Sequence, residues 1–389
     1  MPDQMTIGEL FPADSRLLLT GGGKEFIERV GVEAARQVVL SVMQGENIRT
    51  QTEPLSRRRI AQVTGAMVSL FATGLLQRED FTEQLSTLAI QQINSSRRND
   101  NASIWPAQWL IGLTGKSVQN VLRSDPAARE AYISDFEAAV EEAAEKCRAE
   151  MGSLEMTLGY VQHKSGRKAA LDWKAITRLT TAIGSATLTI RGSDKSIYGK
   201  LFERLILGSF LSIMGFERVN PLTNTKTEKV FWLSDSSDLR ESDATLLISP
   251  GKLARFDIGF IGPGNSEISK DKLSRYAREV ERDGTKHNSV TFIVVDRLPR
   301  TGKTNQAAKE LEAEIIQMSM QFWPKMLAER LGERLGYQHA LQTMPDADIR
   351  AYLEQSLASV AIQDFLIGVS PAELEVETEL PEAAEEIEG

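Results

Sequence analysis

The segment Arg255–Tyr276, RFDIGFIGPGNSEISKDKLSRY, holds residue types that could hydrolyse a phosphodiester bond. Asp257 stands in a run of apolar strand formers that should be buried, and burying a carboxylate is costly unless a cation compensates it. Glu267 follows after a Gly-Pro-Gly turn, and Lys270 and Lys272 come next. Two carboxylates supply hard oxygen ligands for a divalent metal, and a lysine could act on a bound water. The segment therefore predicts metal-dependent phosphodiester hydrolysis.

Glu203 is the only acid in the segment Ile197–Met214, which is apolar on almost every side after Arg204. A helix of this kind packs between a sheet and another layer. One interpretation pairs Glu203 with Lys200 or Arg204 in a salt bridge near the exposed start of the helix. The alternative makes Glu203 an outer metal ligand or a group that orients water.

Asp243 precedes another apolar run, Ala244–Ser249. It could cap the start of a strand, or it could aim its carboxylate at the same pocket as Asp257. The turn signal Pro250-Gly251-Lys252 would join two antiparallel strands, and cross-strand neighbours in such a pair lie close together. The spacing leaves both interpretations open.

A stripe of arginines follows the candidate acids. Arg275, Arg278 and Arg282 recur at i, i+3 and i+7, so they would share one face of a helix. A solvated charged face is the default interpretation, which neighbouring glutamates favour. The alternative is a track of phosphate contacts beside the cleft. Residues 191–310 carry 20 Lys+Arg against 16 Asp+Glu, which is compatible with that alternative.

The segment Trp105–Arg123 has the sequence pattern of a helix-turn-helix, with Gly112–Gly115 as the turn. Its second helix would then present donors and acceptors to a DNA groove. The residues concerned are Lys116, Ser117, Gln119, Asn120 and Arg123. A plain helical hairpin with a polar face is at least as good an interpretation.

Apolar periodicity places these residues in a helical part and a mixed part. From about residue 23 to 184 the pattern is helical, which predicts an all-α domain over residues 1–184. Residues 185–370 predict the order α-β-β-α-β and two more helices, followed by an acidic tail at 371–389 that we expect to be disordered. The elements predicted in the mixed part are helix Ile197–Met214, strand Ala244–Ser249, strand Arg255–Ile261, helix Ser269–Arg282, strand Ser289–Asp296, and helices Asn305–Leu335 and Ala347–Val360.

The composition restricts the class of protein. The chain has 389 residues, enough for two or three domains, and a net charge of -9. The tail from Pro371 holds eight glutamates and no basic residue, so the charge does not argue against DNA as a partner. Cys147 is the only cysteine, which excludes an internal disulfide and predicts a cytoplasmic location. We see no signal peptide, and the apolar stretch Leu205–Phe216 is too short to span a bilayer, so no membrane partner is expected.

Three strings carry a family resemblance. They are YGKLFERLILGSFLSIMGFE, RESDATLL and RFDIGFIGPGNSEISKDKLSRY, between Tyr198 and Tyr276. They resemble the CfrBI-type group of type II restriction endonucleases, within the PD-(D/E)XK nuclease superfamily. The resemblance implies a chain of class α+β/α/β, in which a helical amino-terminal domain precedes a restriction-endonuclease-like mixed-sheet domain.

The chain departs from the superfamily pattern at one place. That pattern has a lysine two residues after the second acid, where this chain has Ser269. Either Lys270 or Lys272 has taken over, or the acid pair is Asp243 and Asp257, with a glycine at the lysine place. Asp257 belongs to the site in both cases.

The resemblance also implies a chemistry. Asp257 and Glu267 would bind Mg²⁺, and Lys272 or Lys270 would orient or deprotonate the attacking water. In-line attack would leave a 5′-phosphate and a 3′-hydroxyl.

Glu203 and Asp243 would hold a second metal or the outer shell of ligands. The expected partner is double-stranded DNA, with a short palindromic site of the CCWWGG type. A homodimer is expected because a two-fold-symmetric enzyme reads equal half-sites. A cognate methyltransferase would belong to the same system, without a stable complex.

Two other functions fit the same residues. The chain could be a noncatalytic DNA-binding regulator that uses Trp105–Arg123 and carries a decayed nuclease domain, which the displaced lysine favours. It could also be a structure-specific repair nuclease of the same fold. Sequence-specific cutting of intact duplex DNA separates a restriction enzyme from both.

Overall fold

A computed structural model of the chain describes residues 6–97, 100–114, 126–152, 159–234, 242–260, 288–296 and 314–374. The chain divides into two compact units, which we call the helical unit and the sheet unit. The helical unit comprises residues 1–21, 56–194 and 375–389, and the sheet unit comprises residues 22–55 and 195–374. Helices α5 (Ile48–Gln77) and α10 (Trp173–Ile213) each contribute residues to both units. Functional domains at 1–184 and 185–370 stay a prediction.

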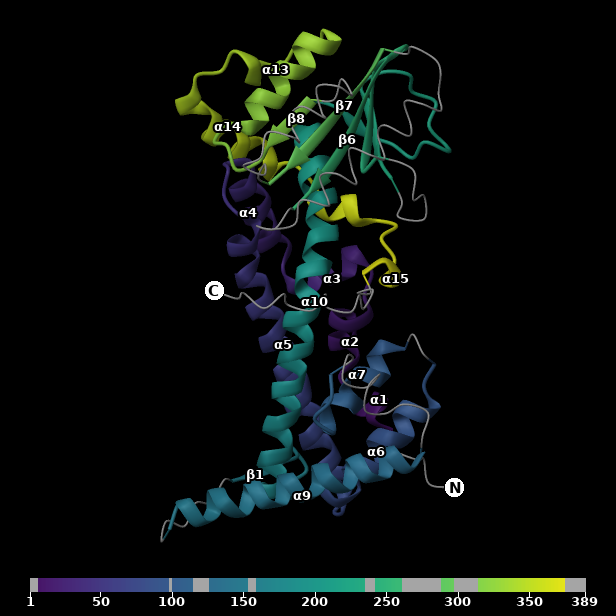
Figure 1. Ribbon diagram of the computed structural model, residues 1–389, viewed down its shortest axis with the longest axis vertical. Coiled ribbons are helices and arrows are strands. Elements are labelled where there is room, and N and C mark those ends of the chain that lie inside the picture. Colours follow the sequence, from purple (N-terminus) through teal and green to yellow (C-terminus); the bar gives the residue numbers. More distant parts are fainter. Residues whose placement is uncertain are drawn as a thin grey trace, which may run out of the picture. The chain divides into compact units, whose positions relative to one another are not determined.

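In its described residues, the helical unit consists of helices and one small hairpin (Figure 1). Many apolar side chains on its helices are buried, as Phe81, Leu85 and Leu88 of α6 illustrate. Trp109 is fully buried, and its indole donates a hydrogen bond to Thr189 Oγ1 at 2.9 Å. Besides its shares of α5 and α10, the described elements of this unit are α1 (Ile7–Leu10), α2 (Ala13–Thr20), α6 (Phe81–Ser95), α7 (Asn101–Leu110), α9 (Pro126–Glu150), β1 (Tyr160–Gln162) and β2 (Lys168–Ala170).

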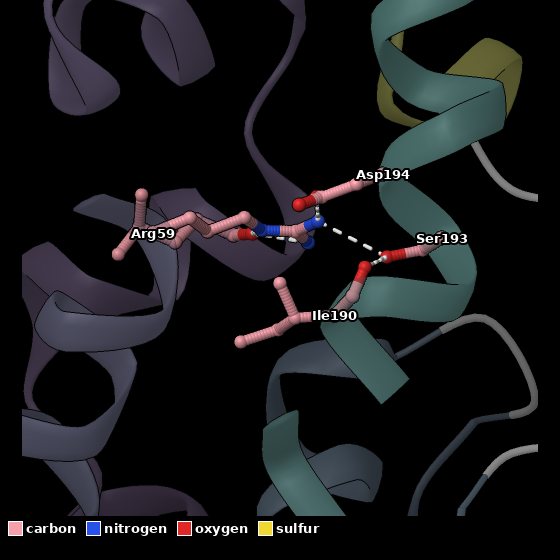
Figure 2. A network of polar contacts seen from close by, with 5 residues as sticks. Arg59, Ile190, Ser193 and Asp194 are labelled. Carbon is pink, nitrogen blue, oxygen red and sulfur yellow. Dashed lines mark hydrogen bonds and ion pairs between the residues drawn. The ribbon is translucent and has the colours of Figure 1, made fainter. Parts of the chain in front are cut away.

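A buried ion pair joins three helices inside the helical unit. Arg59 of α5 lies 2.6 Å from Asp194 of α10, and their side chains are 1% and 7% exposed. The guanidinium also donates to Ser193 Oγ at 3.0 Å and to the carbonyl of Leu18 in α2. Figure 2 shows the Arg59 guanidinium facing Ser193 and Asp194, with the Ser193 hydroxyl directed to the Ile190 carbonyl. Such a pair is stable only while both partners are present, because a lone buried charge is costly.

The sheet unit contains a six-stranded mixed sheet in the order β3-β4-β5-β6-β7-β8 (Figure 1). Strands β4, β5 and β6 are antiparallel neighbours, whereas β7 and β8 continue parallel to β6, and β3 is parallel to β4. The strands are β3 (Glu217–Arg218), β4 (Val230–Leu233), β5 (Ala244–Ser249), β6 (Lys252–Gly259), β7 (Asn288–Val295) and β8 (Glu314–Gln317). The described helices of this unit are α3 (Gly23–Val30), α4 (Val32–Met43), α13 (Trp323–Leu335), η1 (Ala340–Gln342), α14 (Asp346–Ala358), η2 (Ile362–Leu366) and α15 (Pro371–Leu374).

Aromatic side chains fill the core of the sheet unit. Phe256 of β6 stacks on Phe292 of β7 at 5.2 Å between ring centroids. Phe210 of α10 packs against Trp323 of α13, whose indole donates a 2.8 Å hydrogen bond to the Val42 carbonyl of α4. These residues are buried, so the carboxyl-terminal part of α10 has the position predicted for an apolar helix between layers.

The hairpin of β5 and β6 follows directly from its sequence. The strands are joined at Pro250-Gly251, where Gly251 adopts a φ of +80° that a side chain would disfavour. β5 has the predicted bounds, and β6 begins three residues earlier than predicted. β7 begins one residue earlier than predicted.

Three predictions of secondary structure were wrong. Residues Glu314–Gln317 form strand β8 and not part of the helix predicted over Asn305–Leu335, because they pair with β7. α10 runs without interruption from Trp173, although the prediction began a new helix at Ile197. The part predicted to be all-α, residues 1–184, contains the hairpin of β1 and β2; β3 and β4 were not predicted either, and each of these four strands has at most four residues. The predicted helix Ser269–Arg282 and the acidic tail from residue 375 lie outside the described residues.

Within the described residues, one helix, α5, passes a test of length and composition for crossing a membrane. Core helices of soluble proteins pass the same test, so the evidence for a span is weak. The buried ion pair of Arg59 shows that part of α5 is tied into the protein interior.

Candidate active site

Asp243 immediately precedes β5, and Asp257 lies at the corresponding level of the neighbouring strand β6. The antiparallel ladder of β5 and β6 ends at the pair Ala244 and Phe256. One step further, Asp243 Oδ2 accepts a 2.7 Å hydrogen bond from the backbone amide of Ile258. The Asp243 carboxylate therefore accepts the next hydrogen bond along β6, beyond the last backbone pair with β5. Its donor, Ile258, is the residue that follows Asp257.

Alternation along β6 separates the core side from the acid side of the strand. Ala254, Phe256 and Ile258 are buried and share one face. Asp257 points to the other face and is half-buried, whereas full burial was expected. Ile293 of β7 is its register partner and is itself buried. The Asp257 carboxylate thus lies in a partly apolar setting with access to solvent.

Glu203 is half-buried and lies in the part of α10 that belongs to the sheet unit. Its neighbour Arg204 donates a 2.6 Å hydrogen bond to the Ser234 carbonyl and a 3.2 Å bond to the Phe365 carbonyl. The backbone amide of Ser234 in turn donates to the Asp243 carbonyl at 3.2 Å. The structure therefore links the helix turn that carries Glu203 to the strand end that carries Asp243.

Hydroxyl groups fix the backbone next to Asp243. The Ser234 hydroxyl donates to the Ser242 carbonyl. Ser242 is buried, and its hydroxyl lies 3.3 Å from that of Thr245 and 3.2 Å from the Ala244 carbonyl. Because these bonds satisfy polar groups at the end of β5, the position of Asp243 is set by local structure.

The remaining predicted site residues lie outside the described part of the chain. This applies to the catalytic candidates Glu267, Lys270 and Lys272, to the helix-turn-helix candidates Lys116, Ser117, Gln119, Asn120 and Arg123, and to the stripe residues Arg275 and Arg278. Among the described residues there is no group of three or more His, Cys, Asp or Glu side chains placed to hold a metal ion. The described part of the chain offers two carboxylates to a metal ion at this site, those of Asp243 and Asp257.

Two groups that form hydrogen bonds at this site were not identified from the sequence. The Ile258 amide carries no side-chain signal, although its place beside a candidate acid could have drawn attention. Arg204 was considered only as a salt-bridge partner of Glu203, and its hydrogen bonds to two carbonyls were not predicted. An arginine at the start of an apolar helical run is a signal for such carbonyl contacts.

Comparisons with known proteins cover this region. A family model described as CfrBI restriction endonuclease matches residues 32–303. The chain is 30% identical over 357 residues to the type II restriction enzyme CfrBI of Citrobacter freundii, which covers 92% of this chain and 97% of that enzyme. No solved structure matches the chain. Glu203, Asp243 and Asp257 lie within the matched range.

Proposed function

Because the chain belongs to the CfrBI restriction endonuclease family, and is thus a type II site-specific deoxyribonuclease, we propose that Asp243 and Asp257 are its central acid pair. The observation that carries the proposal is the hydrogen bond from the Ile258 amide to Asp243 Oδ2. It holds one carboxylate at the end of β5 beside the strand position of the other. The family resemblance found in the sequence is confirmed, and DNA is the partner that it implies.

The donor chemistry of this pair fits Mg²⁺. Both groups are carboxylates, and Mg²⁺ takes hard oxygen ligands from one or two carboxylates, water and phosphate. Asp257 is half-buried, so its charge is more weakly solvated than that of a surface acid. Bound there, Mg²⁺ would lower the pKa of a water molecule and neutralise charge on the scissile phosphate.

The other residues have supporting tasks in this proposal. Glu203 orients water or holds the outer ligand shell, since the bonds of Arg204 keep its helix turn near Asp243. Lys270 or Lys272 accepts the proton of the attacking water or orients it. Glu267 is the alternative partner of Asp257 in the acid pair. Gly259 occupies the place two residues after Asp257, so a lysine from another segment must act here.

The sheet supports a PD-(D/E)XK fold for this unit. A helix precedes an antiparallel pair that carries the acids, and a parallel strand follows, as the fold requires. We extend the proposal to cleavage that leaves 5′-phosphate ends at a CCWWGG-type palindrome. This extension depends on the family resemblance, as do the proposed cytoplasmic location and the separate cognate methyltransferase. The proposed homodimer depends on the resemblance and also on the symmetry of a palindrome.

A plasmid digestion tests the proposal. Purified protein is incubated with plasmid DNA, with Mg²⁺ or with a chelator in its place. Discrete fragments that require Mg²⁺ are the expected result. An Asp257→Ala variant should give none. Full cutting by this variant would contradict the catalytic role of the acid pair. Cutting in the presence of chelator would contradict the requirement for a metal.

A further inference from the structure

The hairpin of β1 and β2 is a regular two-stranded ribbon in the helical unit (Figure 1). Its register pairs Tyr160 with Ala170, and Gln162 with Lys168. At the tip the His163 amide donates to the Arg167 carbonyl at 2.8 Å. The tip turns at Gly166, whose φ of +88° suits glycine. The ribbon therefore has a defined shape that ends in a tight turn.

Little of this ribbon is buried. Every residue from Gln162 to Lys168 is exposed, and Val161 and Ala169 on the opposite face are half-buried. A two-stranded hairpin with no core of its own is marginally stable in water. Tyr160, 55% exposed, supports it through a contact of 4.4 Å between Lys168 Nζ and its ring. The ribbon presents side chains to a partner and adds little to the protein core.

The charge of the ribbon is positive in an acidic protein. Residues 159–170 contain three cations, Lys164, Arg167 and Lys168, and no carboxylate, whereas the whole chain has a net charge of -9. In the part of the chain that the structure describes, Lys164 and Arg167 form no ion pair.

Some exposed cations elsewhere in the described residues are paired, since Lys146, Lys226 and Arg330 each contact a carboxylate. Lys164 and Arg167 are exposed and have no such carboxylate within those residues, so both are available to an anion from outside the chain.

We propose that the β1–β2 hairpin is a DNA-contacting element, with Lys164 and Arg167 at its tip on backbone phosphates. The inference rests on the family's action on DNA and adds a contact surface to it. A two-stranded ribbon fits the major groove of B-DNA, which is about 12 Å wide. Gln162 and Ser165 lie at the same end and offer hydrogen-bonding groups, while the cations neutralise phosphates.

The test compares two double variants that lose the same charge in the same unit. Lys164→Ala/Arg167→Ala removes the tip cations, and Lys146→Ala/Arg148→Ala removes one lysine and one arginine from exposed positions of α9. Binding to a short duplex is measured over a salt titration without divalent metal, and the length of the DNA is checked afterwards. The tip variant should bind at least about tenfold more weakly, and its salt slope should fall by about 1.8, or about 0.9 for each lost phosphate contact. The α9 variant should bind as the wild type does.

Further controls separate folding and chemistry from binding. A charge-conserving variant, Lys164→Arg/Arg167→Lys, exchanges the two cations and should retain binding, since phosphates accept either cation. Equal loss in the tip and α9 variants would show a general charge effect and overturn the proposal. Wild-type affinity of the tip variant would also overturn it. If the wild type still cuts plasmid in that case, the nuclease function stands without the hairpin.

Discussion

The Asp243 carboxylate accepts a hydrogen bond of 2.7 Å from the Ile258 amide, across the point where the β5–β6 ladder ends. Asp243 thereby has a structural task as a strand-end acceptor as well as its proposed catalytic task. Asp257, adjacent to Ile258, carries its side chain on the face of β6 opposite Phe256 and Ile258. The two acids should therefore respond differently to substitution.

Asp257→Asn should abolish cleavage while DNA binding is kept. The amide has nearly the shape of the carboxylate but lacks its charge, so we expect the cleavage rate to fall more than about 100-fold, beyond the effect typical of groups that merely orient a metal ligand. Asp346→Asn is the matched control, since Asp346 is 61% exposed in the same unit. Single-turnover cleavage and gel retardation check both variants. Equal rates for Asp257→Asn and the control would contradict the assignment.

Two substitutions of Asp243 separate its tasks. An asparagine can still accept the bond from the Ile258 amide, whereas an alanine leaves that amide without this acceptor. Both variants should lose cleavage. Only Asp243→Ala should also lose stability, by about 1–3 kcal/mol. Denaturant unfolding measures this difference, and equal stability of the two variants would show that the hydrogen bond has no structural weight.

Arg59→Ala should destabilise the helical unit strongly. It leaves Asp194 as a buried charge and removes bonds to Leu18 and Ser193, so we expect a loss of about 3–5 kcal/mol. Lys146→Ala, which breaks an exposed pair with Glu142, should not change the unfolding midpoint. A midpoint for Arg59→Ala near that of the control would mean that the buried pair contributes nothing.

Two glycines of α10, nine positions apart, should respond to alanine with opposite signs. A Cβ at Gly208 would lie 2.6 Å from Phe365 Cγ, so Gly208→Ala should destabilise by about 1–3 kcal/mol through overpacking. A Cβ at Gly199 would meet nothing within 4 Å. Gly199→Ala should therefore stabilise the helix by about 0.5–1 kcal/mol. Thermal unfolding compares them, and a shift of the same sign in both would refute the packing described here.

His339 should make the stability depend on pH. Partial burial lowers the pKa of its imidazole, so the unfolded chain binds the proton more readily. The contribution to stability is complete above the ordinary value of about 6.5 and is lost as the pH falls through the lowered folded pKa. His339→Asn keeps an acceptor for the Leu341 amide but does not titrate. Acidification should lower the melting temperature of the wild type more than that of this variant. An equal fall of the melting temperature with pH in both proteins would show that His339 does not cause the pH dependence.

Local patterns predicted the centre of the sheet well. The run Ala244–Ser249 is bounded by a Pro-Gly turn, and β5 has the same bounds in the structure. The same turn allowed Asp243 to approach Asp257, because antiparallel strands bring such positions together, but the sequence did not decide between that position and a cap at the start of the strand. Their catalytic roles stay a prediction, as do those of the residues outside the described part.

Elements fixed by distant partners could not be predicted. β8 is the four-residue string EIIQ, and only pairing with β7 distinguishes it from a helical turn. α10 continues through Gly184 and Gly192, which read as breaks in a sequence. Its middle is held by contacts such as that of Arg59 with Asp194, 135 positions away. Tertiary packing overrides local propensity at these places.

The short hairpin that joins the two central acids has a consequence for how the enzyme acquires its activity. Asp243 and Ile258 are separated by only 15 positions, so little chain entropy is lost when they meet. A small sequence separation favours rapid formation of a contact. We therefore expect the acid pair to be in place before β8, whose partners are more distant in sequence, completes the sheet.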